Sequence, residues 1–207
     1  MRIHDDRYSR ERRRFEVALH FIRFEARTRT IRVWTGLTDD RIRKLYRSYI
    51  RDPLCDARGR NAHLALPVRH RGKSPRQASF FTRSARARHE SSSFASLCRI
   101  TGALPSSPMS AAARDPASLV RGELLCQAYE LYRARFDAPL LSFEHAEFLL
   151  RALCRGDELT LSGCRDCGAL LVSDRWSLRA PRCIVCAPPG TGHRGCRNAR
   201  SRAAWRT

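Results

Sequence analysis

The chain has 207 residues, and its 40 lysines and arginines outnumber its 20 aspartates and glutamates, which gives a formal net charge of +20. A hydrophobic content of 43% excludes a chain that is disordered by composition. The charge favours a polyanionic partner, nucleic acid first and an anionic membrane surface second, although a codon bias toward arginine is an alternative source of part of the excess.

No export or membrane segment is visible in the sequence. The start, MRIHDDRYSRERRR, is charged throughout, and no run approaches the ~18 apolar residues of a membrane-spanning helix. We therefore expect a cytoplasmic protein that does not contact a membrane. Its nine cysteines are then expected to be thiols or metal ligands rather than disulfides.

Three helices are predicted in the N-terminal region. Apolar residues follow the helical period over 8–27, and a short helix over 28–35 is expected to stop at Gly36. Thr38 is a favourable N-cap for a third helix over about 39–50, in which acidic residues occupy the first turn. The residues expected to pack between the second and third helices are Ile31, Leu37, Ile42 and Leu45.

Two loops and one helix are predicted in the middle of the chain. Proline and glycine punctuate a basic stretch over 52–78, which indicates a linker or extended loop. A Phe-containing helix is predicted over 79–101, interrupted around ARARHESSS, and a second loop over 102–114.

Two further helices follow. Asp115 and Pro116 suit the N-cap and first position of a helix that continues to about Phe136. Ser142 is expected to cap the next helix, which ends at Gly156. Short β segments are expected around the four cysteines after Gly156.

These patterns predict a mainly α fold, with a helical N-terminal and central region and a small C-terminal β module like a zinc ribbon. The expected division is N-terminal helices with a helix-turn-helix, a linker, a central helical region, a zinc-binding module and a basic tail predicted to be disordered. The corresponding ranges are 1–51, 52–78, 79–156, 157–189 and 190–207.

The C-terminal module carries two CxxC pairs, Cys164 with Cys167 and Cys183 with Cys186. Their C-x2-C-x15-C-x2-C spacing is typical of zinc sites, because two such turns facing each other complete the tetrahedron that Zn²⁺ prefers. We expect one structural zinc ion, since four thiolates leave no position open for catalysis. The intervening residues are long enough for a β-hairpin, and Trp176 is a candidate to cover the site.

Other roles for the four thiols remain open. A redox CxxC pair, two disulfides and an iron–sulfur cluster would use the same residues. We expect a different role for Cys55, Cys98, Cys126 and Cys154, which are predicted to be buried as small hydrophobic residues. Cys196 lies in the tail and is not assigned as a ligand.

The stretch TRTIRVWTGLTDDRIRKLYR, residues 28–47, has the form of a helix-turn-helix. Its second helix would expose cations that suit the major groove and backbone phosphates of DNA. A basic, solvated face on an ordinary helical hairpin is the alternative interpretation. The candidate DNA-binding residues are Thr38, Arg41, Arg43, Lys44 and Arg47.

Taken together, these segments resemble the FlhC family, a subunit of the bacterial flagellar master transcription activator. The resemblance covers roughly residues 10–190 and is carried by RIRKLYR, SLCRITG, YELYRARFDAPLLSFEHAEFLLRAL and SGCRDCGALL…CIVCAPP. The segment 52–93 departs from the family because it lacks the usual Trp-rich run.

The resemblance implies a helical protein with a C-terminal zinc site at the four cysteines. It also implies an FlhD-like partner in a hetero-oligomer, promoter DNA as ligand, recruitment of RNA polymerase and no enzymatic activity. Two rival hypotheses are an RNA-binding zinc-ribbon protein and an enzyme with a structural zinc site. The sequence contains no nucleophile–base motif, P-loop or GxGxxG to favour the enzyme.

Overall fold

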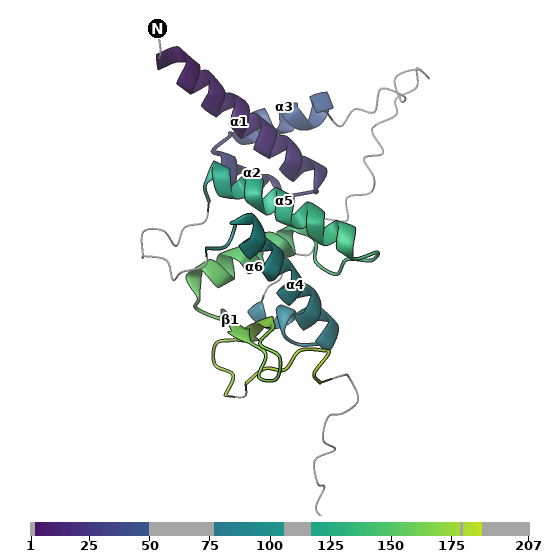
Figure 1. Ribbon diagram of the computed structural model, residues 1–207. Helices are drawn as coiled ribbons and strands as arrows, with labels where there is room; N and C mark the ends of the chain where they lie inside the picture. The colour runs from purple at the N-terminus through teal and green to yellow at the C-terminus, as the bar shows by residue number, and fades with distance from the viewer. Residues whose placement is uncertain (1–2, 50–76, 106–116, 179, 188–207) are drawn as a thin grey trace, which may run out of the picture.

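The structure, a computed structural model, describes residues 3–49, 77–105, 117–178 and 180–187 (Figure 1). Helices carry most of these residues, and the strands among them form one two-stranded antiparallel sheet near the C-terminal end. The prediction of a mainly helical chain with a small C-terminal β element is therefore confirmed. Apart from positions 77 and 78, the expected linker and the basic tail lie outside the described residues.

Helix α1 (Ile3–Arg23) both begins and ends earlier than the predicted 8–27. Its first residues are charged and contribute no apolar period, so the hydrophobic pattern could not locate the start. The helix ends because Glu25 adopts a left-handed φ of 61°. The N–H of Ala26 then donates to the carbonyl of Phe21 at 2.9 Å, which closes the helix terminus.

The two helices of the expected helix-turn-helix form as α2 (Thr28–Thr35) and α3 (Asp39–Tyr49). Gly36 takes the left-handed conformation at the end of α2, and its N–H donates to the carbonyl of Arg32 at 2.8 Å. The Thr38 hydroxyl accepts from the N–H of Arg41 at 3.5 Å, as expected of an N-cap. The apolar corner is also confirmed, with three residues buried and Leu45 packed against them: Ile31, Leu37 and Ile42.

The helix predicted over 79–101 is divided. A 3-10 turn, η2 (Ala78–Phe81), precedes α4 (Ala85–Thr101), which is capped by Ser84. The interruption expected at ARARHESSS is wrong, because that stretch lies inside α4. Ser92 of this stretch is compatible with the helix because it bonds backward: its hydroxyl donates to the carbonyl of Arg88 at 2.6 Å.

Helix α5 (Leu119–Arg135) begins at a different cap from the one predicted. The hydroxyl of Ser118 accepts from the N–H of Arg121, whereas Asp115 and Pro116 lie outside the described residues. Helix α6 (Phe143–Arg155) confirms its prediction, since Ser142 caps its start and Gly156 ends it with a left-handed φ of 67°.

One apolar core joins the helices. Aromatic rings from α1, α5 and α6 meet in it, with the Phe21 and Phe143 ring centroids 4.7 Å apart. A buried carboxylate, Glu90 of α4, accepts hydrogen bonds from the Tyr132 hydroxyl, from the N–H of Leu140 at 2.7 Å and from Arg86 at 2.7 Å. This carboxylate ties α4 to α5 and to the segment before α6.

Gly122 lies where α5 crosses α1 and α2. A Cβ atom at this position would approach Val17 at 3.3 Å and Trp34 at 3.4 Å, and both neighbours are buried. Gly122→Leu is therefore expected to lower the free energy of unfolding by about 1–3 kcal/mol through overpacking, despite a gain in helix propensity. Urea denaturation measures the change. The exposed Gln127→Ala on the same helix serves as control, and an undiminished stability of Gly122→Leu would contradict close packing at this crossing.

Candidate metal centre and basic helix

The first CxxC pair lies in the turn of a β-hairpin. Strands β1 (Leu159–Gly163) and β2 (Leu170–Asp174) pair in an antiparallel register that closes with Gly163 opposite Leu170. Within the turn, Cys164 donates its N–H to the carbonyl of Ala169 at 2.7 Å. Gly168 has a φ of 73° and donates back to the carbonyl of Cys164 at 2.9 Å. These bonds curl the backbone so that the thiols of this pair lie on one side.

The hairpin was expected between the two CxxC pairs, and this prediction is wrong. One strand precedes the first pair and the other follows it, because the metal-binding turn is itself the connection between the strands. The described residues between Asp174 and the second pair, 175–178 and 180–182, form no further strand.

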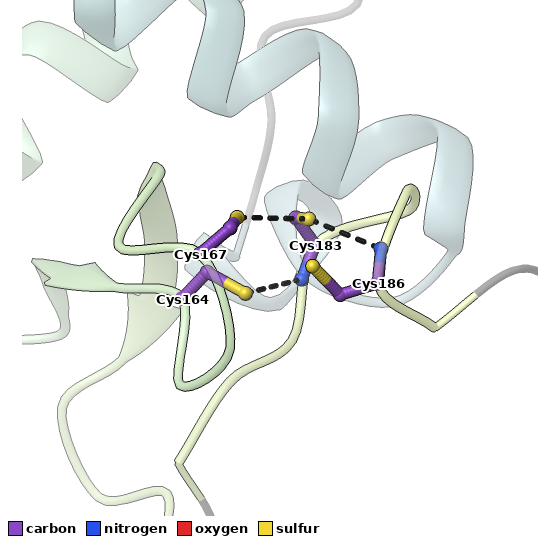
Figure 2. Close-up of side chains that lie close together, drawn as sticks. All are labelled: Cys164, Cys167, Cys183 and Cys186. Carbon is purple, nitrogen blue, oxygen red and sulfur yellow. Dashed lines mark hydrogen bonds between the residues drawn. The ribbon is translucent and has the colours of Figure 1, made fainter.

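The second CxxC pair forms a turn of its own that lies against the first (Figure 2). The N–H of Ala187 donates to the carbonyl of Cys183 at 2.9 Å, which closes the turn. Three contacts join the turns. The N–H of Arg165 donates to the carbonyl of Pro181 at 3.1 Å, and the N–H of Cys183 donates to the Cys164 sulfur at 3.3 Å. The Arg182 guanidinium lies 3.0 Å from the Asp166 carboxylate.

The four sulfur atoms gather at one point, all within 4.8 Å of one another (Figure 2). The Cys167 and Cys183 sulfurs are 3.6 Å apart, well beyond the ~2 Å of a disulfide bond. A tetrahedral Zn(Cys)₄ site with Zn–S bonds of ~2.3 Å has sulfur–sulfur edges of about 3.8 Å. The arrangement therefore suits a single tetrahedral metal ion.

Backbone amides favour thiolates at this site. Hydrogen bonds from the backbone of Cys167 and then of Cys183 lower the pKa of Cys164 to about 6. The backbone N–H of Cys186, 3.3 Å from the Cys183 sulfur, is the main cause that lowers the pKa of Cys183. The pKa of Cys186 is raised, chiefly by its hydrogen bond to Cys183. A metal cation that binds here would displace the thiol protons. The donor set thus fits one bound metal ion.

The strands next to the metal centre pack against the helical core. Leu159 and Val172 belong to the main core, and the N–H of Val172 donates to the hydroxyl of Ser92 on α4 at 2.9 Å. Trp176, the expected cover of the site, does not perform this role. It is 76% exposed, and its ring lies beneath the Arg175 guanidinium, 5.7 Å from the ring centroid.

The remaining cysteines behave as predicted where they are described. Cys98, Cys126 and Cys154 are buried in the core, and burial raises the pKa of each thiol. They are therefore apolar packing groups and not reactive thiolates. Cys55 and Cys196 lie outside the described residues.

The predicted DNA-binding residues are all exposed on or next to α3, but their surroundings differ. Arg41 lies 2.8 Å from the Glu11 carboxylate of α1 and over the Phe15 ring, and Arg43 pairs with Asp40 at 3.1 Å. Lys44 and Arg47, by contrast, have no ion-pair partner among the side chains that the structure describes. Thr38 serves as the helix cap.

Two buried carboxylates of α6 hold α2 in place, and the sequence did not single them out. Glu144 accepts from the N–H of Arg27 at 2.8 Å and from the Thr30 hydroxyl at 3.1 Å. Glu147 accepts from the indole N–H of Trp34 at 3.0 Å, and burial raises its pKa. The available signal was a pair of acidic residues, three positions apart, on the apolar side of a predicted helix.

No described helix has both the length and the apolar character needed to cross a membrane. The comparisons with known proteins find no family model that matches the chain and no curated protein that matches it.

Proposed function

We propose that this chain is a non-enzymatic DNA-binding subunit of a transcription activator. The observation that carries the proposal is the α2–α3 unit, a helix-turn-helix whose second helix exposes a basic face. Glu144 and Glu147 fasten α2 to the core, and α3 packs beside it through the buried Ile42 while Arg43, Lys44 and Arg47 stay exposed. An Arg- and Lys-bearing helix in this setting suits the major groove and its flanking phosphates.

The resemblance to the FlhC family supports a more specific role. We propose that the chain acts in the cytoplasm with an FlhD-like partner in a hetero-oligomer, binds promoters of flagellar operons and brings RNA polymerase to them. The motifs behind the resemblance include RIRKLYR in α3 and the run over 129–153, which forms the end of α5 and most of α6. The α3 motif is the segment that carries the proposed DNA contact.

We propose that the metal is zinc and that its role is structural. Four thiolates at tetrahedral spacing form the ligand set that zinc takes in closed sites. When bound, the ion would supply folding energy to a module with little apolar core of its own. That core consists of Cys164, Leu171 and Cys183, with Cys186 packed against it.

The double variant Lys44→Ala/Arg47→Ala tests the DNA contact. Because neither cation has a described carboxylate partner, both are free to bind phosphate or base edges. We expect at least tenfold weaker binding to a flagellar promoter duplex, with an unchanged melting temperature since both side chains are exposed. Fluorescence anisotropy at fixed salt, on the chain co-purified with an FlhD-like protein, provides the measurement.

Arg43→Ala is the matched control, because Arg43 already pairs with Asp40, and we expect it to weaken binding less. If the double variant binds the promoter as tightly as the parent, α3 is not the DNA-reading element. Equal affinity of the parent for promoter, random duplex and RNA would contradict specific activation.

RNA binding is the second candidate function, and one observation favours it. The exposed Trp176 ring with Arg175 above it offers a surface on which an unpaired base can stack. Trp176→Ala separates the two functions: a large loss of affinity for single-stranded RNA, without a loss for promoter duplex, would favour the RNA-binding alternative.

A further inference from the structure

The first half of α1 projects beyond the rest of the molecule (Figure 1). The described side chains before Phe15 are exposed, with Glu11 half-buried, and the buried residues of the helix begin only at Val17. Two ion pairs connect this stretch to other helices, Arg13 with Glu123 of α5 and Glu11 with Arg41 of α3. A helical segment with so little buried surface is held in shape mainly by continuity with the buried second half.

The charges on this projecting segment fall into two groups. Arg12 pairs with Glu16 at 2.8 Å and Arg13 with Glu123, so their charges are largely balanced within the protein. Arg7 and Arg14 are exposed and have no carboxylate partner among the described side chains. Because the described carboxylates of the segment already have partners, these two arginines leave an excess of positive charge.

The two unpaired arginines share one face of α1. They are seven residues apart, which is close to two full helical turns and a rise of about 10 Å. Arg41 of α3 contacts both Glu11 and Phe15 of α1, so the base of the projecting segment lies next to α3.

We infer that the N-terminal half of α1 is an electrostatic arm that contacts the phosphate backbone of the same DNA duplex that α3 binds, through Arg7 and Arg14. This inference rests on the proposed function and adds to it a second contact surface. The arm contributes affinity without reading bases, because guanidinium–phosphate contacts carry no direct sequence information.

The salt dependence of binding tests the arm. Each phosphate contact contributes about 0.9 to the slope of log affinity against log salt concentration, so Arg7→Ala/Arg14→Ala is expected to reduce the slope by about 1.8. We expect the same reduction on a flagellar promoter duplex and on a random-sequence duplex. Arg23→Ala, an exposed position at the other end of α1, is the control, and its slope should stay near that of the parent.

The outcomes distinguish the arm from the proposed function. An unchanged slope in the arm variant, while Lys44→Ala/Arg47→Ala still weakens binding, overturns the arm and leaves the function standing. If Arg23→Ala reduces the salt slope by as much as each arginine of the arm is expected to, about 0.9, the effect is one of net charge. That result also overturns the arm. Absence of duplex binding by the parent chain overturns both. Loss of affinity for the promoter alone would mean that the arm reads sequence and does not simply hold phosphate.

Discussion

Cys164→Ser is expected to remove the metal ion, which we propose is zinc, and to unfold the two cysteine turns of the C-terminal segment, while β1 and β2 stay packed on the helical core through Leu159 and Val172. The four sulfurs converge on one point, and the two turns that carry them share few other contacts. Structural zinc sites contribute about 10–16 kcal/mol of apparent binding free energy in small zinc-dependent peptides, so the loss of one ligand removes most of what holds these turns together. Elemental analysis gives the stoichiometry, and hydrogen exchange reports the folding of the segment.

Cys98→Ala is the control for this experiment, because Cys98 is a buried thiol of α4 outside the cluster. It should retain a full complement of metal. Cys183→Ser should reproduce the effect of Cys164→Ser, since each cysteine pair supplies half of the ligands. Retention of one zinc ion per chain in both serine variants would show that the metal is not held by these thiols.

Glu90→Ala is expected to lower the free energy of unfolding by about 1–3 kcal/mol for each buried donor that loses its acceptor. The Glu90 side chain is 2% exposed and accepts from Tyr132, Arg86 and Leu140. Its removal leaves the buried hydroxyl of Tyr132 and the N–H of Leu140 without this acceptor. Chemical denaturation measures the loss, and Glu130→Ala, an exposed glutamate of α5, should change stability little.

The pH dependence of stability provides a further check on Glu90. Burial alone raises its pKa, but the hydrogen bonds from Tyr132, Arg86 and Leu140 outweigh burial and place it below the ordinary 4.5. A carboxylate with a depressed pKa stabilises the fold fully above pH 4.5, and this stabilisation is lost as the pH falls through the folded-state value. The stability difference between the parent and Glu90→Gln should therefore narrow below pH 4.5, and a constant difference would contradict an ionised Glu90.

Local signals predicted the elements that carry their own caps. Ser142 and Gly156 delimit α6, and Gly36 with Thr38 delimits the turn between α2 and α3, because capping depends on residues only a few positions apart. The start of α1 was missed for the opposite reason. A charged, exposed helix has no apolar period to reveal it.

The sequence-based predictions were wrong or incomplete where contacts between residues far apart in the chain determine the structure. The serine-rich stretch of α4 looked like an interruption, yet Ser92 is buried against Val172, 80 positions later in the chain. Likewise, Glu144 and Glu147 found donors on α2 more than 100 positions earlier. At the metal centre the spacing of the cysteines predicted a shared site, whereas the position of the hairpin depended on how the strands pair.

The hydrogen bonds of Glu144 and Glu147 to α2 also bear on when the N-terminal helices can reach their final packing during synthesis. The Arg27 amide and its acceptor Glu144 are 117 residues apart, and Trp34 is 113 residues from Glu147. While the chain emerges from the ribosome, α2 therefore has no acceptor for these donors until α6 has been made. The N-terminal helices are translated first, but a nascent or truncated chain that ends before α6 lacks both buried acceptors that tie α2 to the core.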